Sequence, residues 1–153
     1  MIEANSANRG IAQRSFEKLV EKINYSKEKE GKHVSIFCSF LQIYNERVFD
    51  LLNMTSKKGN LMNEKGLRVR YTKKEQFSVE NLYVFECRTA EEILHLFHAG
   101  IKNKIVASHN LNHASSRSHA IFSVTVETVD PNNHDNVITS KLQLVDLAGS
   151  EKI

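Results

Sequence analysis

The chain has 153 residues, of which 41% are hydrophobic and 25% are charged, and its formal net charge is +3. These values are typical of a globular domain, no run of 18 apolar residues could span a bilayer, and so small a charge does not predict a nucleic-acid binder. Because residues 1–10 lack a secretory pattern and Cys38 and Cys87 lack a paired spacing, we expect a cytosolic protein with buried free thiols.

The first third of the chain alternates helical and extended patterns. Apolar residues recur every three or four positions over residues 11–23, which predicts a helix with one buried face. Residues 34–43 are nearly all apolar or small, as in a central strand that is buried on both faces. Residues 44–52 are interpreted as a short helix or turn, and the polar residues 53–66 as a loop.

A hairpin and a second helix are predicted next. Two short strands, residues 67–71 and 77–79, should form a hairpin whose tip presents Lys73 and Lys74 to solvent. Thr89, followed by a glutamate three positions later, has the spacing of a capping box, and an apolar face continues behind it. This pattern predicts a helix over residues 90–101.

The last third of the chain predicts a loop followed by two strands. Residues 103–119 are rich in Asn, His and Ser, which indicates a loop, and alternation from Ala120 onward indicates a strand. A turn at residues 130–133 leads to a second strand that ends at Val145. Helices and strands are interleaved, so we expect an α/β fold with a mixed, mostly β central sheet flanked by helices.

Two motifs adjoin these last strands. Residues 112–119 read Asn-His-Ala-Ser-Ser-Arg-Ser-His, and residues 144–151 read Leu-Val-Asp-Leu-Ala-Gly-Ser-Glu. The first resembles switch I of kinesin motor domains, with its pattern Asn-x-x-Ser-Ser-Arg-Ser-His, and the second resembles kinesin switch II. Both motifs in this order are far more specific than either alone, so the chain resembles the kinesin motor domain family.

The resemblance extends over nearly the whole chain, with departures. Residues 41–52 resemble a kinesin segment that begins Glu-Ile-Tyr-Asn-Glu, but Gln42 replaces the first Glu, and Lys104 stands where the family has arginine. The pattern Gly-x-x-x-x-Gly-Lys-Ser/Thr of a phosphate-binding loop is absent, and the chain stops at Ile153. We therefore expect residues 1–153 to be a partial motor domain, without the phosphate-loop part and without the relay-helix and neck part.

The resemblance implies an ATP-dependent microtubule motor, a microtubule-stimulated ATPase that uses ATP and Mg²⁺ and acts in the cytoplasm on the cytoskeleton. ATP hydrolysis of this kind needs a metal ion, a positioned water and fixed dipoles. The resemblance assigns Asp146 to Mg²⁺ through a water, and the backbone N–H of Gly149 to the terminal phosphate. Lys73 and Lys74 are expected to contact acidic tubulin, the alternative being a solvated tip.

The remaining site residues implied by the resemblance lie on the same two motifs. Asn112 orders the first loop through the backbone or the phosphate region. Ser115 and Ser116 share two roles, one in the Mg²⁺ shell, assigned to Ser116, and one in orienting the water or phosphate, although the order stays open. Arg117 and Glu151 are expected to pair when both loops close over ATP, which would couple closure to hydrolysis.

Two alternatives stay open at this point. The missing phosphate-binding loop is also compatible with a non-catalytic kinesin-derived module that binds microtubules or another partner, or with a truncated product that is inactive alone. A zinc site is a minor alternative, because the His-Glu-x-x-His order is absent. The histidine pairs with a suitable spacing for it are His95 with His98 and His109 with His113.

Overall fold

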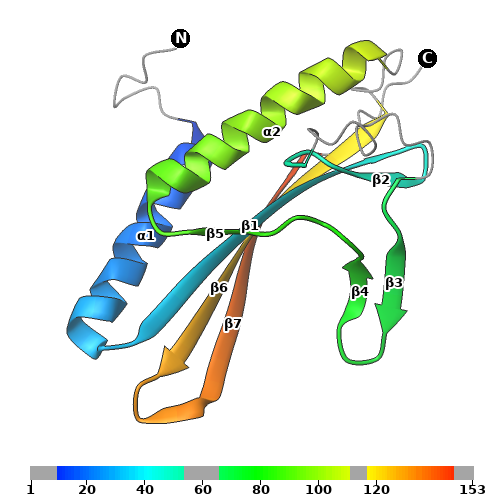
Figure 1. Cartoon of the computed structure of the whole chain (residues 1–153). Coiled ribbons are helices and arrows are strands. Elements are labelled where there is room, and N and C mark those ends of the chain that lie inside the picture. The colour runs from blue at the N-terminus through cyan, green and yellow to red at the C-terminus, as the bar shows by residue number, and fades with distance from the viewer. Residues whose placement is uncertain (1–9, 54–65, 111–116, 147–153) are drawn as a thin grey trace.

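The frame of the molecule is an antiparallel sheet. The computed structural model describes residues 10–53, 66–110 and 117–146, except for the side chains of residues 105–110. The strands of the sheet are β1 (His33–Tyr44), β2 (Arg47–Asp50), β5 (Phe85–Cys87), β6 (Ser118–Asp130) and β7 (Asn133–Asp146). Their order is β2-β1-β6-β7, and β5 pairs with the first half of β1. Figure 1 shows the three long strands crossing the molecule beneath two helices.

Only one face of this sheet carries the core. The buried residues of β1 and β6 alternate along each strand, so they share the face that the helices cover. They are Ile36, Cys38, Phe40 and Gln42 on β1, and Ser118, Ala120, Phe122, Val124 and Val126 on β6. The intervening residues of β1 are half-buried, so the expectation of a strand buried on both faces is wrong for the described part of the chain.

The first helix, α1 (Ile11–Glu30), is longer than the helix that was predicted from the apolar period over residues 11–23. Its last two turns are polar, and Lys27 and Lys29 there are favourable beside the negative end of the helix dipole. The helix ends at Gly31, whose φ of 63° lies in the left-handed region that glycine adopts without steric cost. Its buried face consists of Phe16, Val20 and Ile23.

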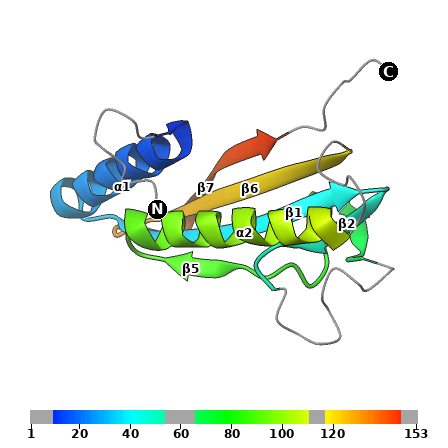
Figure 2. The ribbon, with the colours of Figure 1, turned by 90° about the horizontal axis from the view of Figure 1, so that it is seen from above.

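The second helix, α2 (Ala90–Asn110), begins at the predicted capping box. The backbone N–H of Glu92 donates to Oγ1 of Thr89, at 3.2 Å, and Oε2 of Glu92 accepts from the backbone N–H of Arg88, at 2.7 Å. The helix continues two turns beyond its predicted end, so the loop predicted over residues 103–119 is wrong for residues 103–110. Seen from above in Figure 2, α2 lies along β1.

Four phenylalanine rings fill the layer between the helices and the sheet. Phe16 comes from α1, Phe97 from α2, Phe40 from β1 and Phe122 from β6. Phe122 contacts each of the other three rings, with centroid distances of 5.1 to 5.4 Å. These tilted and edge-to-face pairs are the preferred geometry of aromatic rings, so the cluster fixes how both helices sit on the sheet.

The segment after β1 contains a turn, which was one of the two predicted alternatives, but this turn joins β1 to the strand β2 in a tight hairpin and the short helix is absent from residues 44–52. Asn45 and Glu46 both have positive φ, at 50° and 61°, which is the conformation of a two-residue type I′ turn. The turn pairs Tyr44 with Arg47. The strand after the turn was not predicted, because glutamate is an unusual residue at the second position of such a turn and concealed the hairpin signal.

A second, two-stranded sheet forms the predicted hairpin. Its strands are β3 (Val69–Thr72) and β4 (Gln76–Val79), and Lys73 and Lys74 are exposed in the turn between them. Tyr71 pairs with Phe77, and their exposed rings pack at 5.1 Å. Figure 1 shows this hairpin projecting from the main sheet, which confirms the solvated tip.

Candidate functional site

The pairing of β6 with β7 brings the two sequence motifs to the same edge of the sheet, namely the edge at which β6 begins and β7 ends. Arg117 immediately precedes β6, and Asp146 is the last residue of β7. The strand register places Asp146 opposite Ala120, which in turn lies opposite Gln42 on β1. The end of the motif at residues 112–119 and the middle of the motif at residues 144–151 are therefore neighbours in space.

Helix α2 is tied to this edge by two polar side chains. The Nζ atom of Lys104 contacts Oδ2 of Asp146 at 2.5 Å, and Nδ2 of Asn103 donates to the carbonyl oxygen of Leu51 at 2.6 Å. The Lys104 side chain is 14% exposed, whereas that of Asp146 is 71% exposed. Because water screens such a pair, it adds at most about 1 kcal/mol to stability. Its main effect is to hold the lysine over the end of β7.

The same edge contains buried polar groups. Gln42 is fully buried and Ser118 is 1% exposed, and both lie on the face that α2 covers. Neither amide atom of Gln42 nor the hydroxyl of Ser118 has a hydrogen-bond partner among the described residues. An unpartnered buried polar group costs about 1–3 kcal/mol, so this end of the apolar sheet face is less favourable for stability than the rest.

The structure describes only some of the predicted site residues. Arg117 is exposed directly before β6, and Asp146 lies at the end of β7, so these two reach the same edge. Lys73 and Lys74 lie on the projecting hairpin, away from that edge (Figure 1). Five other predicted residues lie outside the described ranges: Asn112, Ser115, Ser116, Gly149 and Glu151.

Sequence reasoning missed three residues of this edge. Lys104 was noted only as a replacement for arginine, and its pairing with Asp146 joins positions 42 apart in the chain. Gln42 lay inside the strand expected to be buried on both faces but was not singled out as a buried polar group, and Ser118 was assigned to the predicted loop. One signal was available for Gln42, since it follows Phe40 by two positions in an apolar strand and so had to share its face.

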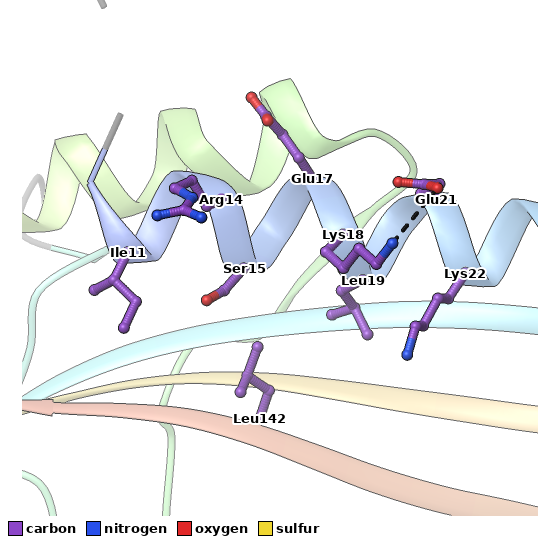
Figure 3. A pocket seen from close by; sticks show the side chains of 9 residues that line it. All are labelled: Ile11, Arg14, Ser15, Glu17, Lys18, Leu19, Glu21, Lys22 and Leu142. Carbon is purple, nitrogen blue, oxygen red and sulfur yellow. Dashed lines mark ion pairs between the residues drawn. The ribbon is translucent and has the colours of Figure 1, made fainter. Parts of the chain in front are cut away.

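An open groove lies elsewhere, between α1 and the edge of β7 (Figure 3). Its volume is about 740 Å³, and Leu142 of β7 is its apolar floor. The charged residues that line it all come from α1, and Lys18 pairs with Glu21 at 3.7 Å with both side chains largely exposed. Solvated charges of this kind contribute little binding energy, so the groove lacks the converging polar groups of a small-ligand site.

The zinc alternative receives no support from the described residues. No three His, Cys, Asp or Glu side chains in the described ranges gather as metal ligands. His95 and His98 lie on α2, whereas the side chains of His109 and His113 lie outside the described part.

Among the described helices, neither is long and apolar enough to cross a membrane.

Comparisons with known proteins match the whole chain. Residues 1–153 match the family model described as the kinesin motor domain. The chain is 42% identical over 147 residues to kinesin-like protein KIF15-A of Xenopus laevis and 40% identical over 147 residues to KIF15 of Homo sapiens. It is also 40% identical over 154 residues to KIN-12G of Oryza sativa. These alignments cover 94–97% of the chain but only 10–11% of each relative, so the chain spans about a tenth of their length.

Two solved structures share the fold. A fast kinesin, described in connection with ATPase mechanism and interactions with microtubules, superposes with a TM-score of 0.84 at 29% identity. That alignment covers 98% of this chain and 39% of the other. A second structure contains the C-terminal motor and motor homology domain of Kar3Vik1, fused to a synthetic heterodimeric coiled coil. It superposes with a TM-score of 0.74 at 26% identity, and the alignment covers 94% of this chain and 34% of the other. These matches confirm the predicted mixed α/β fold.

Proposed function

This chain belongs to the kinesin motor domain family, and from that membership we propose that it forms the nucleotide-sensing part of an ATP-dependent microtubule motor. In this proposal, ATP binding and hydrolysis act through the motifs at residues 112–119 and 144–151 to change the grip on microtubules in the cytoplasm. The proposal takes residues 1–153 as a partial motor domain.

The strand register of β6 and β7 carries this proposal. It places Arg117, at the end of the first motif, and Asp146, in the second, at the same edge of the sheet. Two segments that respond to the same phosphate must meet around it, and strand ends are a common place for such sites. If the two motifs belonged to separate surfaces, they could not act on one nucleotide.

The residues at this edge fit a magnesium nucleotide. Asp146 offers a largely exposed carboxylate at a strand end, and carboxylate oxygens are hard ligands of the kind that Mg²⁺ prefers. In the proposal, Ser115 and Ser116, which lie outside the described residues, would add hydroxyl oxygens. When bound, Mg²⁺ neutralises charge on the phosphates. In the proposal, Asp146 orients a metal-bound water, the Gly149 N–H donates to the terminal phosphate, and Asn112 orders the first loop.

We expect Asp146→Asn to raise the Mg²⁺ concentration needed for half-maximal ATP turnover by about 10- to 100-fold, as for other partners of metal ligands. The measurement is a Mg²⁺ titration of ATPase activity in a motor that joins this chain to a phosphate-binding loop. Lys104→Met is the matched control, because it also removes the ion pair with Asp146 but leaves the carboxylate. An unchanged Mg²⁺ requirement in Asp146→Asn would contradict the assignment.

We propose that the β3–β4 hairpin contributes to microtubule binding through Lys73 and Lys74. Replacing both lysines by alanine should weaken microtubule affinity several-fold at low salt, since an exposed ion pair contributes up to about 1 kcal/mol. The difference should shrink as salt screens the charges. Lys27→Ala with Lys29→Ala removes the same charge from the end of α1, on the opposite side in Figure 1, and serves as the control. If the loss of microtubule affinity did not depend on salt concentration, the two lysines would be removed from the proposal as a microtubule contact.

A further inference from the structure

The two cysteines of the chain are neighbours in the sheet although their positions are 49 apart in the sequence. Cys38 lies on β1 and Cys87 on β5, and the register pairs Ile36 with Cys87 and Cys38 with Phe85. The two thiols are therefore diagonal neighbours on the face that the helices cover. Both are free, and they are 0% and 3% exposed. The sequence predicted two buried free thiols, and the structure adds that they lie next to each other.

A hydrogen bond between the thiols makes them unequal. This bond, followed by burial, raises the pKa of Cys38 well above its usual range, so Cys38 keeps its proton. The same bond lowers the pKa of Cys87, against the opposing effects of burial and of the charges of Glu92 and Glu86. Because a thiolate is the reactive form of cysteine, Cys87 is the better nucleophile of the two.

Cys87 also borders an opening to solvent, and Cys38 does not. The pocket has a volume of about 520 Å³ and lies between β5 and the first turns of α2. Besides Cys87, its lining consists of Phe85, Glu86, Glu91, Glu92, His95 and Leu96. Of the two cysteines, Cys87 is therefore the one that lines a path from solvent.

We propose that Cys38 and Cys87 form a thiol–disulfide exchange site for small disulfides such as glutathione disulfide. The Cys87 thiolate attacks one sulfur of the reagent, a mixed disulfide forms, the reagent's S–S bond breaks, and one glutathione thiolate leaves. The Cys38 sulfur then attacks the Cys87 sulfur, the bond from Cys87 to glutathione breaks, and the second glutathione leaves as a thiol, with the proton that Cys38 loses. The two protein thiols are oxidised to one disulfide, and the reagent is reduced to two thiols.

The spacing of the strands makes this disulfide labile. Diagonal residues of an antiparallel pair have Cα atoms about 7–8 Å apart, whereas disulfides span up to about 6.8 Å. β5 therefore has to shift toward Cys38 by about an ångström. A three-residue strand that pairs with β1 through three residues resists such a shift weakly. Strained disulfides of this kind are readily reduced, as in redox-regulated sites.

The test is intact-mass spectrometry of the reduced, folded chain after exposure to glutathione disulfide. The wild-type chain should lose the mass of two hydrogen atoms, and Cys38→Ser should stop at a single glutathione adduct. Cys87→Ser should react at least about tenfold more slowly, because the remaining thiol, Cys38, is fully buried and does not line the opening. In urea, where the chain is unfolded, both variants should react at similar rates. Peptide mapping of the wild-type chain at early times should find the first adduct on Cys87.

Three results would overturn the proposal. The folded wild-type chain could stay unreactive at glutathione disulfide concentrations that modify the urea-unfolded chain. The first adduct could appear on Cys38, or the wild-type chain could accumulate two adducts with no disulfide. Peptide mapping is done on the wild-type chain, so it identifies the cysteine that reacts first even if a serine variant folds poorly.

Discussion

Replacing Arg117 or Glu151 by alanine, in a motor that joins this chain to a phosphate-binding loop, is expected to reduce microtubule-stimulated turnover by at least about 100-fold. Breaking a desolvated ion pair costs about 3–5 kcal/mol, and each 1.4 kcal/mol in a barrier is a factor of about ten in rate. ATP affinity should change little, because the phosphate-binding loop supplies most of the contacts to the phosphates. Steady-state ATPase assays and nucleotide titrations measure the two quantities separately.

A charge exchange distinguishes an ion pair from two independent roles. If Arg117 and Glu151 pair when the loops close, the double variant Arg117→Glu with Glu151→Arg should recover part of the turnover that each single variant loses. Two solvated charges with unrelated contacts would give no recovery. Normal turnover in either alanine variant would end the proposal that this pair couples closure to hydrolysis.

Most elements of the fold follow from residue patterns, and the errors have identifiable physical causes. The apolar period of α1 and the alternation of β6 were sufficient to predict both elements, because each buries one face. Helix α2 was predicted too short, since Ile101 is followed by the polar residues Lys102, Asn103 and Lys104 and the segment to residue 119 is rich in Asn, His and Ser. There the side chain of Asn103 bonds the carbonyl oxygen of Leu51, a tertiary contact that local propensity does not contain.

The candidate site was predicted through its motifs and not through its geometry. Asp146 was assigned through the motif at residues 144–151, and the register now places it opposite Ala120, near the start of β6. Its partner Lys104 comes from a helix whose packing on the sheet depends on the aromatic cluster. The sequence pattern of either segment alone contains no information on that packing, so their contact could not be predicted.

Gly100→Ala should lower the stability of the chain although alanine favours helices. A methyl group at position 100 would lie 2.2 Å from Cδ2 and 2.6 Å from Cε2 of Phe40, far inside van der Waals contact. The Phe40 ring has no room to move, because it stacks on Phe97 at 5.8 Å and meets Phe122 edge-on at 5.1 Å. Overpacking of this severity costs about 1–3 kcal/mol or more, and exceeds the gain of about 1 kcal/mol from helix propensity.

The measurement is the urea midpoint of the chain with Gly100→Ala, with Phe40→Leu, and with both changes. If the methyl group and the ring compete for one space, the double variant should be less destabilised than the sum of the single variants. A midpoint that rises in Gly100→Ala would mean that helix propensity dominates and that α2 does not press on β1 at this position. Since α2 carries Lys104 to Asp146, the same close approach also sets the geometry of the candidate site.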